Sequence, residues 1–198
     1  MGSQRSSPTQ RRTFRWPVLL VVLWTMACSG CVAETICINF HPAVVEIEPP
    51  GYLPDIGKPF GDRGNGFSYG WNVDNSANMK EQNWLRDVRY NTWIVMQDRN
   101  GNYSWEIELP NGTYGVHVVG GDCRGTRGAP MRKELLVGIL VEGKPAVQGV
   151  MTNETSWLEG TVTVSVSDGR LTVSNAPDAT WNRMCFIEIW PVKAGRTC

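Results

Sequence analysis

Apolar and polar residues alternate along much of this 198-residue chain, which is the spacing of strands with one buried face. The clearest example is residues 161–175, TVTVSVSDGRLTVSN, where apolar residues alternate with polar ones on both sides of Asp168-Gly169. Asp-Gly is a common central pair of two-residue turns because both residues tolerate positive φ angles. The pattern predicts a β-hairpin with one face in the core.

The same alternation recurs on both sides of Pro110-Asn111-Gly112. It predicts a strand over residues 104–109, a turn, and a partner strand over residues 114–119. No stretch keeps apolar residues at helical spacing for three turns. We therefore expect an all-β fold, a two-layer β-sandwich of one domain. Its further strands are expected at residues 37–40, 92–97, 135–141 and 184–190, and one short helix at residues 79–89.

Residues 1–33 have the composition of an export signal. A basic stretch, Arg5 to Arg15, precedes an apolar run from Trp16 to Ala27 that is short for a membrane span, and ACSGC comes next. We expect the chain to be exported, to the periplasm, the outer membrane or the extracellular space. Cys28 or Cys31 is a candidate for the lipidated cysteine of a bacterial lipoprotein, and QRRTFR is either a twin-arginine signal or an ordinary basic region.

Composition limits the nature of the exported part. About 165 residues remain after the signal, enough for one domain and its core, which we place at residues 34–192 with a short tail at residues 193–198. The whole chain has 19 basic and 19 acidic residues, and several basic ones lie in the signal, so the exported part is mildly acidic. This charge argues against nucleic acid as a partner.

The cysteines outside the signal are spaced too widely for a zinc motif: Cys37, Cys123, Cys185 and Cys198. An oxidising compartment would permit disulfides. If the first and last strands pair, as they often do in β-sandwiches, Cys37 and Cys185 could be bridged. The alternative is that both are buried thiols.

Residues for catalysis are scarce. The only histidines are His41 and His117, and His117 lies in the middle of a strand, YGVHVV, where an outward-facing polar residue is ordinary. The chain has no G-x-S-x-G motif, and Glu106 and Glu108 lie opposite the apolar face of their strand. We therefore expect a protein that is not an enzyme and needs no cofactor. A structural calcium ion is still considered because acidic residues lie in loops, namely Asp55, Asp62, Asp74, Asp122 and Asp178.

One segment combines glycine, aromatic and amide residues: residues 61–75, GDRGNGFSYGWNVDN. Aromatic faces stack on the C–H faces of a pyranose, and short amide and carboxylate side chains bond its hydroxyls. The segment therefore predicts a sugar-binding loop that uses Tyr69, Trp71, Asn72 and Asp74. A second Trp-Asn pair, Trp181-Asn182, lies in a similar loop. The alternative is an ordinary buried aromatic cluster.

Several segments, in order, resemble one family. They are INF at residues 38–40, P-x-GY at 49–52, FGDRGNGFSYGWN at 60–72, RYNTWIVMQ at 89–97, WEIELPNGTYGVHVVGGD at 105–122, DGRLTVSN at 168–175 and CFIEI at 185–189. From Ile38 to Ile189 the chain resembles the malectin-like, galactose-binding-type β-sandwich carbohydrate-binding modules of bacterial extracellular proteins. It departs from the family pattern at residues 123–131, CRGTRGAPM.

The resemblance implies a jelly-roll module that binds a polysaccharide or another glycan through loops at one end of the sandwich, without catalysis. It implies Tyr69 in FSYG and Tyr90 in RYN as aromatic contacts, and an aspartate that matches either Asp122 or residues 178–182. The alternative is a surface domain that is structural or binds another protein. Together, residues and resemblance predict eight ligand-binding residues: Tyr69, Trp71, Asn72, Asp74, Tyr90, Asp122, Trp181 and Asn182.

Overall fold

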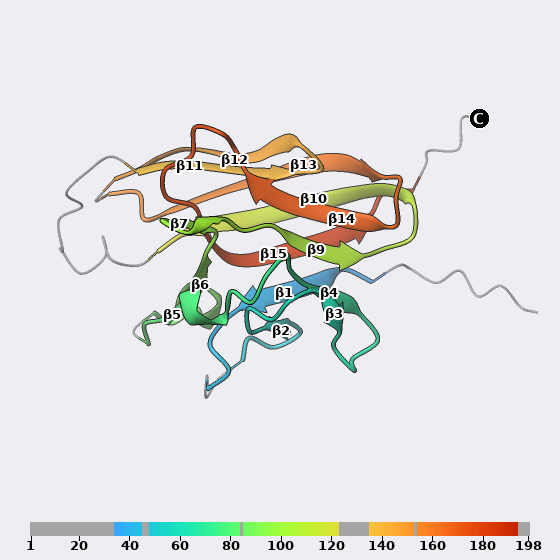
Figure 1. Cartoon of the computed structure of the whole chain (residues 1–198), viewed down its shortest axis with the longest axis horizontal. Coiled ribbons are helices and arrows are strands. Elements are labelled where there is room, and N and C mark those ends of the chain that lie inside the picture. The colour runs from blue at the N-terminus through green and yellow to red at the C-terminus, as the bar shows by residue number, and fades with distance from the viewer. Residues whose placement is uncertain (1–33, 45–47, 84, 123–134, 153, 194–198) are drawn as a thin grey trace, which may run out of the picture. The chain divides into compact units, whose positions relative to one another are not determined.

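β-Strands form nearly all the regular structure of the domain. The computed structural model describes residues 34–44, 48–83, 85–122, 135–152 and 154–193, which all lie in one unit, Val32–Cys198. These residues contain two short 3-10 helices and no α-helix. The fold is an all-β, jelly-roll-like sandwich, as the sequence predicted (Figure 1). The predicted signal, its lipidation candidates and most of the C-terminal tail lie outside the described residues.

The strands form two main sheets. The seven-stranded sheet has the order β13 (Trp157–Val166), β10 (Gly112–Gly121), β15 (Arg183–Pro191), β1 (Ile36–Phe40) and β2 (Leu53–Asp55), with β6 (Thr92–Val95) beside β15 and β5 (Met79–Glu81) beside β6. The six-stranded sheet has the order β12 (Lys144–Met151), β11 (Leu135–Val141), β14 (Arg170–Asn175), β9 (Trp105–Glu108), β4 (Ser68–Trp71) and β3 (Gly61–Asp62). A small ribbon, β7 (Gln97–Asp98) with β8 (Gly101–Asn102), and the 3-10 helices η1 (Ser76–Asn78) and η2 (Val88–Tyr90) complete the fold.

Both predicted hairpins are wrong in their pairing, although their strands are placed correctly. Strand β9 pairs with β14 and β4, whereas β10 pairs with β13 and β15, so the chain crosses between the sheets after β9 and again after β13. Asn111 ties the two crossings together. Its side chain donates to the Ser167 carbonyl at 2.9 Å and accepts from the Gly169 N–H at 2.8 Å. The alternation of apolar and polar residues determines which face of a strand is buried. It does not determine the partner strand, because the same face is buried whether the chain forms a hairpin or crosses to the other sheet.

A tight hairpin joins β11 to β12 instead. Val141 lies opposite Lys144, and the two residues between them, Glu142 and Gly143, have φ angles of 49° and 70°. Positive φ at both central residues is the geometry of a type I′ turn, whose twist matches that of the flanking strands. The strand pattern predicted β11 but not this pairing.

Asp55 places a buried carboxylate in the core between the sheets. Asp55, which is 1% exposed, accepts the indole N–H of Trp71 at 3.0 Å, the indole N–H of Trp105 at 2.8 Å and the backbone N–H of Gly57 at 2.8 Å. Burial raises the pKa of this carboxyl, and the three donors oppose that shift. Phe40 packs edge-on against both indoles, with ring centroids 5.9 and 5.7 Å away. Two of the largest rings of the chain are thereby fixed inside the sandwich.

Two smaller predictions are also corrected. The helix expected at residues 79–89 is wrong, because this stretch begins as β5, in register with β6, and ends in η2. Strands β1 and β15 do pair, but Cys37 lies opposite Glu188, so the bridge between Cys37 and Cys185 is not formed. None of the described helices is long and apolar enough to cross a membrane.

Candidate functional site

The outer face of the seven-stranded sheet carries a second apolar cluster with polar groups beside it. Outward positions of neighbouring strands form rows across this face: Val119 lies between Glu159 and Phe186, and in the next row His117 lies opposite Glu188. The loop that precedes β6 covers this face, and its apolar residues pack on the Val119 row. The site is therefore outside the sandwich and not between its sheets.

Three side chains fix the loop that carries the RYN motif. Asn91 accepts the N–H of Leu85 at 2.9 Å and donates to its carbonyl at 3.0 Å, which closes the loop. Asp87 caps η2 by accepting the N–H of Arg89 at 3.1 Å. Asn39 of β1 donates to the Arg89 carbonyl at 3.2 Å and so ties the loop to the sheet.

Tyr90 lies at the centre of the site. Its ring packs at nearly a right angle against Trp157, with centroids 5.4 Å apart, and against Phe186, with centroids 5.2 Å apart. A cavity of about 410 Å³ opens beside these rings, lined by Leu85, Arg86, Asp87, Tyr90, Trp157 and Glu159. A second cavity of about 550 Å³ shares Arg86 and Asp87 with the first and reaches to Tyr52. Cavities of these volumes are the size of ligand sites.

A chain of polar contacts runs from the cavity along the sheet. Glu159 lies 3.2 Å from Nε2 of His117, and Nδ1 of His117 lies 3.1 Å from Glu188. The Tyr52 hydroxyl donates a short hydrogen bond to Glu188. Arg89 donates to the Tyr52 hydroxyl at 3.0 Å and lies 3.6 Å from Glu188. Both ring nitrogens of His117 are thereby occupied, which orients the two glutamates.

Charge in the site is set mainly by Arg89. Its guanidinium donates to both carboxylate oxygens of Asp87, at 3.0 and 2.7 Å, and these bonds lower the pKa of Asp87. Burial, with the bond to Glu188, raises the pKa of Tyr52, and burial raises the pKa of Tyr90. At neutral pH the site therefore presents anionic Asp87 and neutral phenols. The Tyr90 hydroxyl makes no hydrogen bond within the described ranges.

The stacking role predicted for Tyr69 and Trp71 is contradicted by their burial, 0% and 1% exposed. The Tyr69 hydroxyl donates to the Pro54 carbonyl at 2.8 Å, and the Trp71 indole is held by Asp55. Both rings face the core between the sheets, whereas Tyr90 lies on the outer face. The alternative of an ordinary buried aromatic cluster is correct for these two residues.

The polar residues of the same loop are exposed but serve the loop itself. Asn72 accepts the N–H of Ser104 at 3.1 Å, which joins β4 to the segment before β9. Asp74 accepts the N–H and the hydroxyl of Ser76, at 3.0 and 2.5 Å, and lies 4.0 Å from Lys58. Neither lines one of the two cavities on the outer face.

The three remaining predicted residues lie apart from Tyr90. Asn182 is fully buried and bonds both the N–H and the carbonyl of Gly138, at 2.8 and 2.5 Å. Asp122 is fully buried and ion-paired with Arg183, whose guanidinium carbon lies 4.4 Å from the Trp181 ring centroid. Asp122 and Asn182 are thus engaged inside the fold, and Tyr90 alone of the eight residues lines the outer-face cavities.

Sequence reasoning missed Trp157, Glu159 and Asp87. The sequence did indicate the first two, because successive residues of a strand face opposite sides. The buried valines of β13 have even numbers, whereas Trp157 and Glu159 have odd numbers and face outward. A tryptophan at an outward position among threonines and serines is a candidate for ligand contact. Asp87 had no such signal, since its role depends on the fold of η2.

No metal site accompanies these residues in the part of the chain that the structure describes, where no group of three or more His, Cys, Asp or Glu side chains could hold an ion. Four of the five loop aspartates considered for calcium have other partners. Asp62 accepts the N–H of Gly64 at 2.8 Å, and Asp55, Asp74 and Asp122 are engaged as described above.

Comparison with solved structures shows a likeness of fold. Over 81% of this chain, protein YxiM of Bacillus subtilis aligns with a TM-score of 0.55 and 20% identity, and a β-glucuronidase of Bacteroides uniformis with a TM-score of 0.53 and 13% identity. This chain spans 40% of the length of the first protein and 18% of the second. Both likenesses agree with the sandwich described above.

A family 35 carbohydrate-binding module of Clostridium thermocellum aligns over 58% of this chain and 89% of its own length, at 13% identity, and its TM-score of 0.36 carries no argument. No family model matches the chain, and a search of curated proteins finds no match. Membership of the malectin-like family stays a prediction.

Proposed function

We propose that this chain is an exported, non-catalytic carbohydrate-binding module that holds a sugar residue of a glycan in the 410 Å³ cavity on the outer face of the seven-stranded sheet. The observation that carries the proposal is the combination of Tyr90 and Trp157, set at 82° to each other, with the carboxylates of Asp87 and Glu159 lining the same cavity. Apolar rings beside oxygen acceptors are the chemistry that a pyranose requires.

The residues have separate roles in this proposal. Tyr90 and Trp157 contact the C–H faces of the sugar, and Asp87 and Glu159 accept hydrogen bonds from its hydroxyls. The Tyr90 hydroxyl and the exposed Arg86 supply donors. Because sugar hydroxyls exchange water bonds for protein bonds, the net gain is small, and we expect a Kd of about 10 µM to 1 mM, roughly −4 to −7 kcal/mol.

The arrangement of His117 supports binding without catalysis. A glycosidase needs one carboxyl as acid and another as base or nucleophile on the two sides of a scissile bond. Glu159 and Glu188 instead contact the two nitrogens of the same imidazole, which lies between them. No serine, threonine or cysteine of the described segments is hydrogen-bonded to His117, so a nucleophile for a histidine base is also missing there.

The comparisons add limited support. The B. uniformis protein is named as a glycosidase, and a domain with the fold of this chain accounts for a minor part of it. Because likeness at 13% identity shows the fold alone, the sugar, the export and the lipid anchor at Cys28 or Cys31 are parts of our proposal.

A glycan and polysaccharide array probed with the full chain tests this function. Trp157→Ala removes one wall of the cavity and should abolish binding to whichever glycan the full chain retains. Trp190→Ala is the matched control, because Trp190 lies opposite Gly115 on the same sheet and does not line the cavity. Loss of binding in both variants, or in neither, would contradict the assignment, provided that circular dichroism shows both to be folded.

A further inference from the structure

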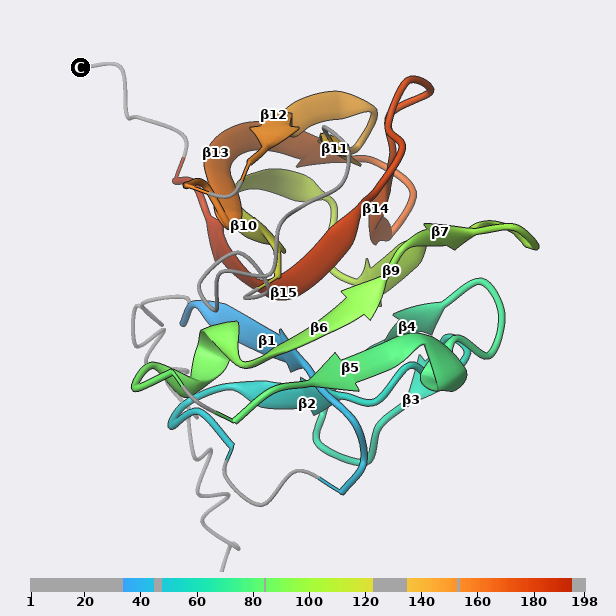
Figure 2. The ribbon, with the colours of Figure 1, turned by 90° about the vertical axis from the view of Figure 1, so that its left-hand side faces the viewer.

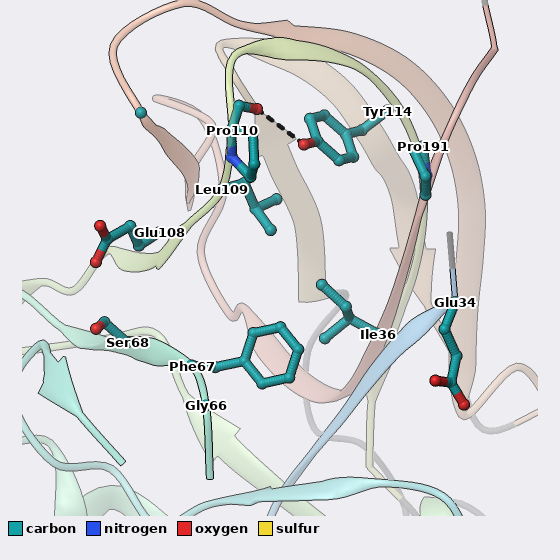
Figure 3. A pocket seen from close by; sticks show the side chains of 11 residues that line it. Glu34, Ile36, Gly66, Phe67, Ser68, Glu108, Leu109, Pro110, Tyr114 and Pro191 are labelled. Atoms are coloured by element: carbon teal, nitrogen blue, oxygen red, sulfur yellow. Dashed lines mark hydrogen bonds between the residues drawn. The ribbon is translucent and has the colours of Figure 1, made fainter. Parts of the chain in front are cut away.

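A larger cavity lies at the other end of β10. Trp157 of the outer-face site is opposite Gly121, the last residue of β10, whereas Tyr114, near the start of β10, lines the larger cavity. The volume is about 690 Å³. Its walls come from the segment that opens β1, the turn between β3 and β4, the crossing from β9 to β10, and the end of β15 (Figure 3).

The walls are apolar. Ile36, Phe67 and Leu109, from three separate segments, point into the cavity (Figure 3). Two polar groups beside these side chains already have partners: the Tyr114 hydroxyl donates to the Pro110 carbonyl at 2.8 Å, and the Leu109 N–H donates to the Gly169 carbonyl at 3.0 Å. Sugar hydroxyls would find few bonds here, so this cavity suits a different ligand from the outer-face site.

The charges at the rim have one sign. Glu34 and Glu108 are exposed, and neither forms a hydrogen bond or ion pair within the described residues. Among the described residues, no lysine, arginine or histidine lines the cavity. By contrast Glu106, on the same outward face of β9 as Glu108, pairs with Arg170 at 2.8 Å. The two unpaired carboxylates lie on opposite sides of the apolar side chains (Figure 3).

We propose that this cavity is a docking site for a peptide segment of a partner protein, in which a large apolar side chain lies between two lysine or arginine residues. The apolar side chain fills the space between Ile36, Phe67 and Leu109, and the flanking cations pair with Glu34 and Glu108. A ligand with a single positive charge would leave one carboxylate unpaired. This inference does not depend on glycan binding, which uses the other end of β10.

The test uses ¹⁵N-labelled full chain and the peptide Gly-Lys-Trp-Lys-Gly with blocked ends, with Gly-Glu-Trp-Glu-Gly and Gly-Lys-Ser-Lys-Gly as comparison peptides. We expect saturable amide shifts for Gly-Lys-Trp-Lys-Gly at Phe67, Leu109 and Gly169, and much weaker ones for the other two. Added salt should weaken binding, because the charge pairs are exposed.

Variants separate this site from a general attraction of basic peptides. The double change Glu34→Gln with Glu108→Gln should weaken binding about fivefold to tenfold, as expected for two exposed ion pairs. Glu81→Gln with Glu154→Gln removes the same charge away from the cavity and should leave binding unchanged. Shifts that map elsewhere, equal binding of the acidic peptide, an equal effect of both double variants, or no saturable binding at millimolar peptide would each overturn the proposal.

Discussion

At the scale of single residues, Asp55 holds two of the aromatic rings of the core, those of Trp71 and Trp105. It accepts the indole N–H groups of Trp71 and Trp105 with its two oxygens. An amide has only one oxygen, so Asp55→Asn would turn an N–H group toward one indole donor. We expect the free energy of unfolding, measured in urea, to fall by about 2–4 kcal/mol. The exposed Asp178→Asn should have no effect, and unchanged stability of Asp55→Asn would contradict this role.

The Asp87–Arg89 pair should make a pH-dependent contribution to stability. Arg89 lowers the pKa of Asp87 below its unfolded value, so the contribution is present above the unfolded pKa and is lost as pH falls through the folded pKa. Asp87→Asn should therefore lower the melting temperature at pH 7 slightly. The corresponding loss in free energy of unfolding should be less than about 1 kcal/mol, because the pair is partly exposed. In strongly acid solution the two proteins should melt together. A difference that persists there would exclude the ion pair as its cause.

Residue types alone could not separate a core ring from a site ring. Tyr69 and Tyr90 both lie in polar stretches, yet Tyr69 packs in the core, where its hydroxyl bonds the carbonyl of Pro54 from another segment. Trp157 could have been found from the sequence, since it lies on the same face of β13 as the polar residues of that strand. The prediction of Tyr90 as a ligand contact came from the RYN motif, and the other two residues of that motif, Arg89 and Asn91, fix the loop.

At the scale of elements, alternation predicted most long strands but not their partners. Strands β9, β10, β13 and β14 appear where expected, and the outward side of His117 is confirmed by its contacts with glutamates. The pairing differs because a turn such as Asp168-Gly169 can connect two strands of one sheet or two strands of different sheets. In the structure only Gly169 of this pair has a positive φ, 85°, whereas a type I′ hairpin turn needs two such residues.

The meeting of two sheet edges provides a test of packing between elements. Strands β12 and β13 run side by side, one from each sheet (Figures 1 and 2). A Cβ atom at Gly160 would overlap the carbonyl oxygen of Ala146. Gly160→Ala should therefore destabilise the protein by about 1–3 kcal/mol in urea denaturation. Gly61→Ala, where the added atom meets nothing within 4 Å, is the control and should be nearly neutral. Equal stability of both variants would show that the edges are not in contact.

At the scale of the whole domain, the core and the two proposed binding sites occupy three separate regions. The rings held by Asp55 fill the space between the sheets, the Tyr90 site lies outside the seven-stranded sheet, and the apolar cavity lies at the other end of β10. Under the two proposals the domain would hold a glycan and a protein segment at once, because the two cavities share no described lining residue. This arrangement suits a module that links a carbohydrate to a partner.

The most direct test of the central claim locates the bound sugar. A glycan that the array identifies is titrated into ¹⁵N-labelled full chain, and the amide shifts are mapped onto the sequence. We predict that the largest shifts occur at residues 87–90 and 157–159. In the Trp157→Ala variant the same glycan should cause no shifts. Shifts centred on residues 61–75, with residues 157–159 unaffected, would contradict the account and return the site to the glycine-rich loop.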